Sequence, residues 1–208
     1  VPWAKTVAER VRSIDERAVP ALLRAGAAAG IDYRAVTRTL ARPELIAWAR
    51  LARTPKIGPL TFHGLLARFR NPAAALEALP RLSKHAAPPE AQIVAELDAL
   101  EALGARLVAS CEPDYPPLLA QLDAPPALIA LRGDAGLLKR PTIAIVGSRE
   151  GSAAALLFAE RIAGDLGAAG FTVVSGMARG IDAAAHRGAL ASGTAAVLAG
   201  GLDHPYPP

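Results

Sequence analysis

Two apolar segments, each ending in a glycine-containing loop, decide the fold predicted for this 208-residue chain. The first reads Ile143-Ala144-Ile145-Val146-Gly147-Ser148-Arg149, and the second reads Thr172-Val173-Val174-Ser175-Gly176-Met177-Ala178-Arg179-Gly180-Ile181-Asp182. Near-continuous runs of apolar residues are typical of strands that are buried on both faces of a parallel sheet. Helical patterns over 152–168 and 182–191 separate the strand-like runs 143–146, 172–174 and 195–198. The sequence therefore predicts an α/β domain built from βαβ units.

Polar, glycine-containing loops follow all three of these predicted strands. The third loop reads Gly200-Gly201-Leu202-Asp203-His204. Because the carboxyl ends of parallel strands share one edge, where open α/β folds bind their ligands, we expect the three loops to form one pocket. Glycines allow close approach to the backbone, helix N-termini attract anions, and Arg149 and Arg179 add planar cations. Ser175 offers a hydroxyl in the same place.

The loops lack the signatures of common nucleotide sites and of hydrolases. There is no Gly-x-Gly-x-x-Gly fingerprint followed by an acid, no phosphate-binding P-loop, and no Gly-x-Ser-x-Gly elbow. Asp182 and His186 lie four residues apart and supply only two ligands, too few for a zinc site. We interpret this pair as structural, with Asp182 near the first turn of its helix. The sequence thus predicts neither catalytic residues, nor a metal, nor a cofactor.

Composition agrees with an anionic partner and with an intracellular setting. The formal net charge is +4 and the calculated pI is about 9.6, which favours anions without proving a site. Cys111 is the one cysteine, so a disulfide within the chain is excluded and a reducing cytoplasm is expected. No apolar run is long enough for a membrane span, so no membrane association is predicted.

The part of the chain before residue 105 is predicted to be helical. Residues 1–42 are interpreted as a helical extension of unassigned role, and 43–104 as a separate helical domain. Within that domain, a tight turn reads Thr54-Pro55-Lys56-Ile57-Gly58-Pro59 between two amphipathic helices, and Gly104 ends the last helix. The turn resembles helix-hairpin-helix and SAM-like modules, which bring backbone N–H groups to a DNA phosphate. Lys56 stands where such a hairpin has its first glycine. The turn is either a second DNA contact through Lys56 and Gly58 or a structural hairpin.

At these motifs the chain resembles the DprA/Smf family of DNA processing proteins. The resemblance is close over 105–208 and loose over 43–104. It rests on residues in four places: the approach segment Tyr115-Pro116-Pro117-Leu118-Leu119; Val146-Gly147-Ser148-Arg149; Ser175-Gly176 with Gly180-Ile181-Asp182 and His186; and Gly201, Asp203 and Tyr206-Pro207.

The resemblance implies a Rossmann-like domain that binds single-stranded DNA and is not an enzyme. It implies delivery of that DNA to the RecA recombinase during natural transformation. Carried onto this chain, it places one phosphate on Gly147, Ser148 and Arg149, and another on Ser175, Gly176, Arg179 and Gly180. Asp182, His186, Gly200 and Gly201 would shape the loops. In the family this domain continues past Tyr206-Pro207 and self-associates, so an incomplete domain is expected here, with a homodimer possible in the full-length protein.

Two other functions are compatible with parts of the pattern. One is a nucleotide-type enzyme or sensor of a related Rossmann-like superfamily, which would carry a Pro-Gly-Gly-x-Gly-Thr loop followed by a glutamate. This chain has Gly200-Gly201-Leu202-Asp203 at that place instead. The other is a helical interaction module whose α/β half has no binding role. It is disfavoured because three strand ends keep the same kind of loop.

Overall fold

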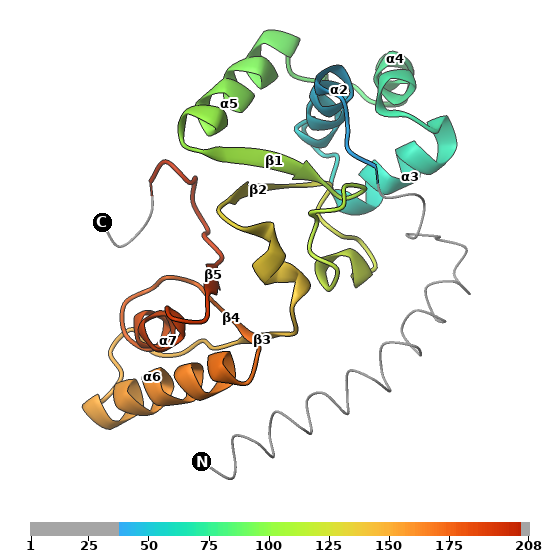
Figure 1. Cartoon of the computed structure of the whole chain (residues 1–208). Helices are drawn as coiled ribbons and strands as arrows, with labels where there is room; N and C mark the ends of the chain where they lie inside the picture. Colours follow the sequence, from blue (N-terminus) through green and yellow to red (C-terminus); the bar gives the residue numbers. More distant parts are fainter. Residues whose placement is uncertain (1–37, 205–208) are drawn as a thin grey trace. The chain divides into compact units, whose positions relative to one another are not determined.

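The computed structural model describes residues 38–204, which form two compact units divided between Gly133 and Asp134 (Figure 1). Most of the helical extension predicted over 1–42 and the motif Tyr206-Pro207 lie outside the described residues. The first unit contains four helices and a pair of strands. The second contains a parallel sheet and two helices. The segment 105–133, which contains the first two strands, therefore belongs to the helical unit. The sequence had predicted a domain boundary before residue 105.

Local sequence signals set the limits of the helices in the first unit. They are α2 (Arg42–Ala52), α3 (Pro59–Phe69), α4 (Pro72–Leu82) and α5 (Glu90–Ala102). Proline stands in the first turn of α2, α3 and α4, where its missing N–H costs no hydrogen bond. The side chain of Asn71 caps α4 by accepting from the N–H of Ala74 at 2.8 Å. Gly104 adopts a left-handed φ of +66° after α5, which ends the helix as predicted.

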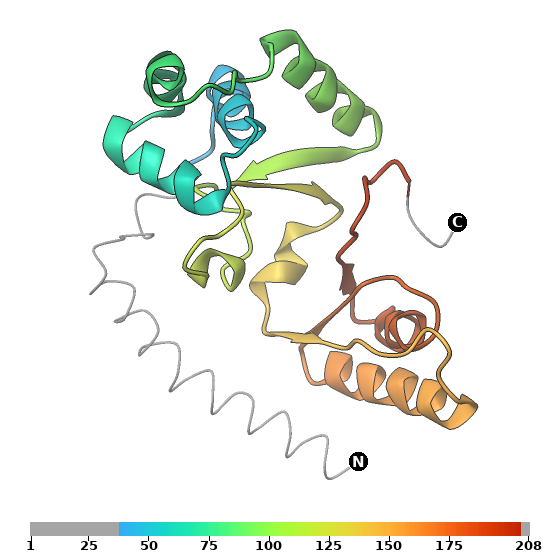
Figure 2. The same ribbon diagram turned by 180° about the vertical axis from the view of Figure 1, so that it is seen from behind.

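Two strands that precede the predicted βαβ region do not join the parallel sheet. They form β1 (Ala105–Ala109) and β2 (Leu128–Arg132), which pair antiparallel with Ala105 opposite Arg132 and Ala109 opposite Leu128. β1 is buried at four of its five positions because it packs beneath α2 and α5. The pair therefore completes the core of the helical unit (Figure 2).

A buried tryptophan ties α2 to the segment before β2. The indole N–H of Trp48 donates to the carbonyl of Ala127 at 2.8 Å, and its ring packs against Phe62 of α3 with centroids 5.2 Å apart. Trp48 is 6% exposed and Ala127 is 8% exposed, so water cannot readily replace this hydrogen bond. The bond holds residues 79 positions apart in the chain.

We predict that Trp48→Phe destabilises the first unit by about 1–3 kcal/mol, because the buried carbonyl of Ala127 loses its donor. The measurement is the free energy of unfolding in urea. Leu60→Ala is the control, since Leu60 is 73% exposed and its truncation should change stability by less than about 0.5 kcal/mol. Equal stability of Trp48→Phe and the parent chain would contradict the prediction.

The second unit has the predicted βαβ architecture. Its elements are β3 (Thr142–Ala144), α6 (Ala153–Ala168), β4 (Thr172–Ser175), α7 (Ile181–Ala189) and β5 (Thr194–Ala196). The three strands are parallel and lie in the order β3-β4-β5. The connections β3-α6-β4 and β4-α7-β5 both step in the same direction across the sheet. Because such connections are right-handed, both helices lie on the same face of the sheet. The core between them contains Val173 of β4 together with apolar residues of both helices.

Glycines let α6 and α7 approach each other closely (Figures 1 and 2). A Cβ at Gly188 of α7 would lie under 3.0 Å from the backbone of Glu160 in α6, and one at Gly164 would lie 3.2 Å from the carbonyl of Gly188. The two helices are thus fixed in position by backbone packing. None of the helices in the described part of the chain is long and apolar enough to cross a bilayer.

Candidate nucleic-acid interface

Three loops leave the carboxyl edge of the parallel sheet. Loop A is 146–152 after β3, loop B is 176–180 after β4, and loop C is 197–204 after β5. The strand ladder continues into the loops, because the N–H of Ile145 donates to the carbonyl of Val174 and that of Val197 donates to Ser175. The loops therefore begin side by side, as parallel strands require.

Gly180 fastens loop B against loop A. It adopts φ +81° and ψ −126°, a conformation that side chains other than hydrogen rarely tolerate. A Cβ at this position would lie under 3.0 Å from the carbonyl of Ser148 and from the backbone of Arg149. The next residue, Ile181, donates its N–H to the same Ser148 carbonyl at 3.1 Å. Only glycine lets the two backbones meet at this distance.

The side chain of Ile181 fills the space beneath loop A. A Cβ on Gly147 would lie 2.8 Å from Ile181, and one on Gly151 would lie 3.2 Å from its Cδ1. Both glycines of loop A are thus explained by one β-branched side chain from the start of α7. Ile181 is not among the site residues predicted from the sequence, since a local pattern does not identify partners 30 or more positions away.

We predict that Gly180→Ala destabilises the second unit by roughly 2–4 kcal/mol, from backbone strain plus the clash with loop A. Urea unfolding followed by circular dichroism measures the change. Gly64→Ala is a control of opposite sign: Gly64 lies within α3, a Cβ there meets nothing within 4 Å, and alanine favours the helix. A Gly180→Ala chain as stable as the parent would show that the loop contact is dispensable.

Ser175 and Asp182 act from beneath the loops. Ser175 is 3% exposed, and its hydroxyl donates to the carbonyl of Ile145 at 2.6 Å. That hydroxyl joins the ends of β3 and β4 and does not face an incoming ligand. Asp182 is 6% exposed, and its Oδ2 accepts from the N–H of Ala178 at 3.4 Å. The same carboxylate lies where a Cβ on Gly176 would be, 2.9 Å away, so Asp182 supports loop B from within.

His186 bonds to the sheet and not to Asp182. Its Nδ1 lies 2.9 Å from the hydroxyl of Thr194, which donates its own proton to the carbonyl of Val173 at 2.6 Å. Nδ1 must therefore carry a proton, which leaves Nε2 as an acceptor. Nε2 of His186 and Oδ1 of Asp182 are buried and have no hydrogen-bond partner in the described part of the chain. Burial lowers the pKa of His186, and the negative charge of Asp182 offsets only part of this effect.

We predict that the neutral state of His186 makes stability depend on pH. The unfolded chain binds a proton more readily than the folded one, so this stabilisation is complete above the usual pKa of 6.5 and is lost as pH falls below it. Urea midpoints measured from about pH 7.5 down to about pH 5 should fall more steeply for the parent chain than for His186→Gln.

The control for this titration is His204→Gln, because the His204 imidazole is 86% exposed. That variant should keep the parent profile. If the urea midpoints of the parent chain and of His186→Gln fell in parallel with pH, protonation of His186 would cost the folded chain no stability, and the prediction would be wrong.

Loop A presents its polar groups to solvent. Gly147, Ser148 and Arg149 are exposed, and the N–H groups of Arg149 and Gly151 have no acceptor among residues 38–204. The first turn of α6 contains no acidic residue, so no carboxylate within the helix compensates its positive dipole end, and the exposed Glu150 lies in loop A before the cap. The hydroxyl of Ser152 caps α6 by accepting from Ala155 at 3.3 Å. This combination of free donors and positive potential suits an anion.

Loop B presents one cation, Arg179, before helix α7, whose positive dipole end is compensated by the carboxylate of Asp182. Arg179 is exposed, and neither it nor Arg149 makes an ion pair within the described part of the chain. In contrast to α6, helix α7 has Asp182 in its first turn. The two helix ends thus differ in where the nearest acid lies: Asp182 is inside the first turn of α7, whereas Glu150 precedes the cap of α6.

Loop C folds mainly upon itself. A Cβ on Gly201 would lie under 3.0 Å from the carboxylate of Asp203, which also pairs with His204 at 2.9 Å. Gly200 has only the carbonyl of His204 nearby, at 3.9 Å from a Cβ built there. The structure brings loops A and B together, whereas the contacts of Gly200 and Gly201 are local.

In the hairpin between α2 and α3, Lys56 has a backbone conformation that is typical of glycine. Lys56 is exposed and has a left-handed φ of +67°, the conformation that glycine would adopt most easily. Gly58 precedes α3, and a Cβ there would meet nothing within 4 Å. Lys56 thus adds a positive charge to a turn whose backbone conformation is one that glycine favours. No cluster of three or more metal-ligating side chains occurs in the region 38–204.

Comparison with known protein families gives two adjoining matches. Residues 42–102 match the DprA-like N-terminal HHH domain, and residues 106–208 match the DNA recombination-mediator protein A family. The helix-hairpin-helix domain predicted over 43–104 is thereby confirmed. The Rossmann-like prediction is supported by a solved structure, that of DNA processing protein A from Streptococcus pneumoniae. It has a TM-score of 0.60 at 25% identity and covers 82% of this chain and 62% of that one.

Curated relatives match shorter stretches. DNA processing protein DprA of Streptococcus pneumoniae is 41% identical over 95 residues, which are 45% of this chain and 33% of that protein. Protein Smf of Escherichia coli is 38% identical over 126 residues, or 57% of this chain and 32% of that protein. A putative DprA of Mycobacterium tuberculosis is 55% identical over 71 residues, or 31% and 17%. The chain spans about a third or less of the length of these relatives.

Proposed function

Because the chain belongs to the DprA/Smf family, we propose that its α/β unit binds single-stranded DNA at loops A and B. The observation that carries the proposal is loop A together with the start of α6 that follows it. Loop A has unpaired N–H groups at Arg149 and Gly151 and the exposed guanidinium of Arg149, and the first turn of α6 contains no acidic residue. A phosphodiester is the anion whose repeated charge would use this edge most fully.

Each of the two loops would bind one phosphate of the single-stranded DNA. In this proposal Gly147, Ser148 and Arg149 hold one phosphate, and Gly176, Arg179 and Gly180 hold the next. Ser175 contributes from behind by fixing the strand ends, since its hydroxyl is already bonded to Ile145. Asp182 and His186, together with Gly200 and Gly201, shape the loops.

Binding of this kind would be tolerant of sequence. Backbone N–H groups and arginines recognise phosphates, and no aromatic side chain is part of loops A and B to stack on bases. Sequence-independent binding suits a protein that protects whatever strand it meets. We further propose that the full-length protein acts in the cytoplasm without catalysing a reaction, passes the strand to the RecA recombinase during natural transformation, and forms a homodimer.

We predict that the chain binds fluorescently labelled oligo-dT, and that Arg149→Ala/Arg179→Ala weakens binding by about 10–100-fold. The slope of log K against log salt should become shallower by about 1.4, because two phosphate contacts on a single strand are lost. Fluorescence anisotropy at several salt concentrations measures both quantities.

The matched control is Arg132→Ala/Arg161→Ala, which removes the same charge from exposed positions outside the loops. It should leave the slope unchanged. Binding that survives in the loop variant would place the strand elsewhere, with the hairpin at Lys56 and Gly58 as the next site to vary. Equal weakening by both double variants would mean that net charge alone drives binding, and this result would contradict the proposed site.

A further inference from the structure

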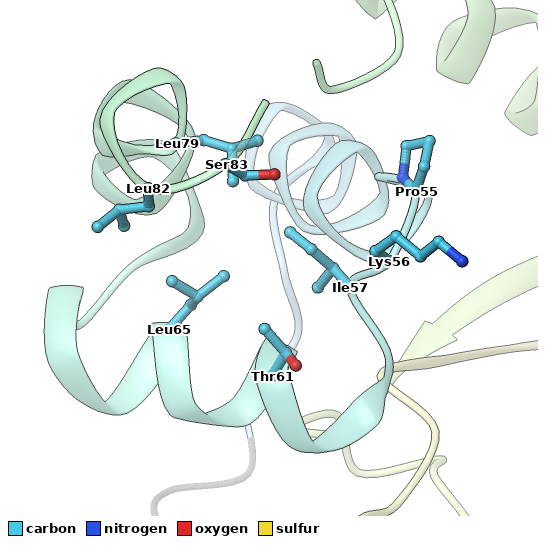
Figure 3. Close-up of a pocket in the computed structure, with 8 residues that line it drawn as sticks. All are labelled: Pro55, Lys56, Ile57, Thr61, Leu65, Leu79, Leu82 and Ser83. Carbon is cyan, nitrogen blue, oxygen red and sulfur yellow. The ribbon is translucent and has the colours of Figure 1, made fainter. Parts of the chain in front are cut away.

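An apolar pocket lies in the helical unit, apart from the strand-end loops. It has a volume of about 190 Å³ and is bounded by α3, α4 and the hairpin loop before α3 (Figure 3). Leu65 of α3 and Leu79 and Leu82 of α4 line it on one side, and Ile57 of the hairpin lines it on the other. Leu82 is 46% exposed, so the pocket opens to solvent along an aliphatic wall.

The surface around this pocket is strongly cationic. Residues 53–85 contain six Lys and Arg and a single acid, Glu77. Arg53 is neutralised by Glu96 of α5 at 2.7 Å, and Arg68 lies over the ring of Phe69. The remaining four are exposed and make no ion pair within residues 38–204. They are Lys56, Arg70, Arg81 and Lys84.

Two of these cations stand beside pocket residues at opposite ends. Lys56 lines the pocket at the hairpin end, and Lys84 directly follows Ser83 at the α4 end (Figure 3). Three of the four acids of α5 are engaged by other arginines, which leaves Glu77 of α4 and Glu90 of α5 against these four cations. Arg42 binds Asp98 and Glu101, while Arg53 binds Glu96. Lys56 therefore supplies positive charge in the pocket lining itself, and Lys84 is an exposed cation next in sequence to the lining residue Ser83.

We propose that this pocket is a docking site for an acidic protein segment that inserts one apolar side chain between carboxylates. The aliphatic lining rewards burial of a leucine-like or phenyl side chain, and the flanking lysines favour acids on either side of it. A nucleic acid fits less well. The lining residues include no aromatic ring for stacking, and a phosphate would lose its hydration against leucines. The inference goes beyond the proposed DNA site and does not depend on it.

The test uses the whole chain and a short fluorescent peptide in which one leucine is flanked on both sides by glutamates. Anisotropy should give a Kd of roughly 10–100 µM, as for small, transient interfaces. The same peptide with serine in place of leucine should bind at least about tenfold more weakly, because the buried apolar group is lost. Methyl NMR should show shifts at Leu65, Leu79 and Leu82.

Variants of the chain separate the two parts of the recognition. Leu82→Asn and Lys56→Glu/Lys84→Glu should each weaken the peptide at least about threefold, the second in a salt-dependent way. Leu60→Asn is the control, because Leu60 is 73% exposed and does not line the pocket.

Three results would overturn the proposal. They are equal binding of the leucine and serine peptides, methyl shifts confined to other parts of the chain, and stronger shifts of the same methyls by oligo-dT. The last result would identify the pocket as a nucleic-acid surface. Because the readouts are at α3 and α4, they are independent of whether loops A and B bind DNA.

Discussion

The backbone contact between Gly180 and loop A is the constraint on which the strand-end site depends. Two chain segments meet there without side chains between them, and the N–H of Ile181 then reaches the carbonyl of Ser148. Burial of the Ile181 side chain against Gly147 and Gly151 closes the same contact from below. The loops are thus shaped by the fold before any ligand arrives, which lowers the entropy cost of binding. The exposed arginines sit on a backbone that is already positioned.

The sequence predicted those features that depend on local pattern. The βαβ order, the helix limits and the start of three loops at one sheet edge follow from apolar periodicity and from the rule that parallel strands end at one edge, whereas only loops A and B contact each other closely. The pairing of β1 with β2 was not foreseen, because strand propensity does not identify a partner and these strands are separated by a long segment without strands. The hydrogen bond of the Ser175 hydroxyl could likewise not be predicted from the sequence, because its acceptor, the carbonyl of Ile145, is brought near only by the fold.

The two units use charge in different ways. In the helical unit three of the four acids of α5 pair with arginines of α2 and of the turn that follows it, and exposed cations outnumber acids around α3 and α4. In the α/β unit the asymmetry is between helix ends. Asp182 compensates α7 from within, while α6 begins with a serine cap and no acid. Positive potential is therefore produced by lysines and arginines in one unit and mainly by oriented peptide groups in the other.

The dominance of peptide groups in loop A has a consequence for how such a surface changes by mutation. A side-chain substitution removes a guanidinium or a hydroxyl, but it leaves an N–H where it was. Alanine scanning would therefore detect Arg149 and Arg179 and would miss the donors at Gly151 and its neighbours. Changes that matter would instead add atoms, because a methyl group at Gly147 or Gly180 moves the backbone itself. The proposed interface would thus be more sensitive to added bulk than to the loss of side-chain functional groups. Replacing a backbone amide by an ester would remove one N–H donor and so test its contribution.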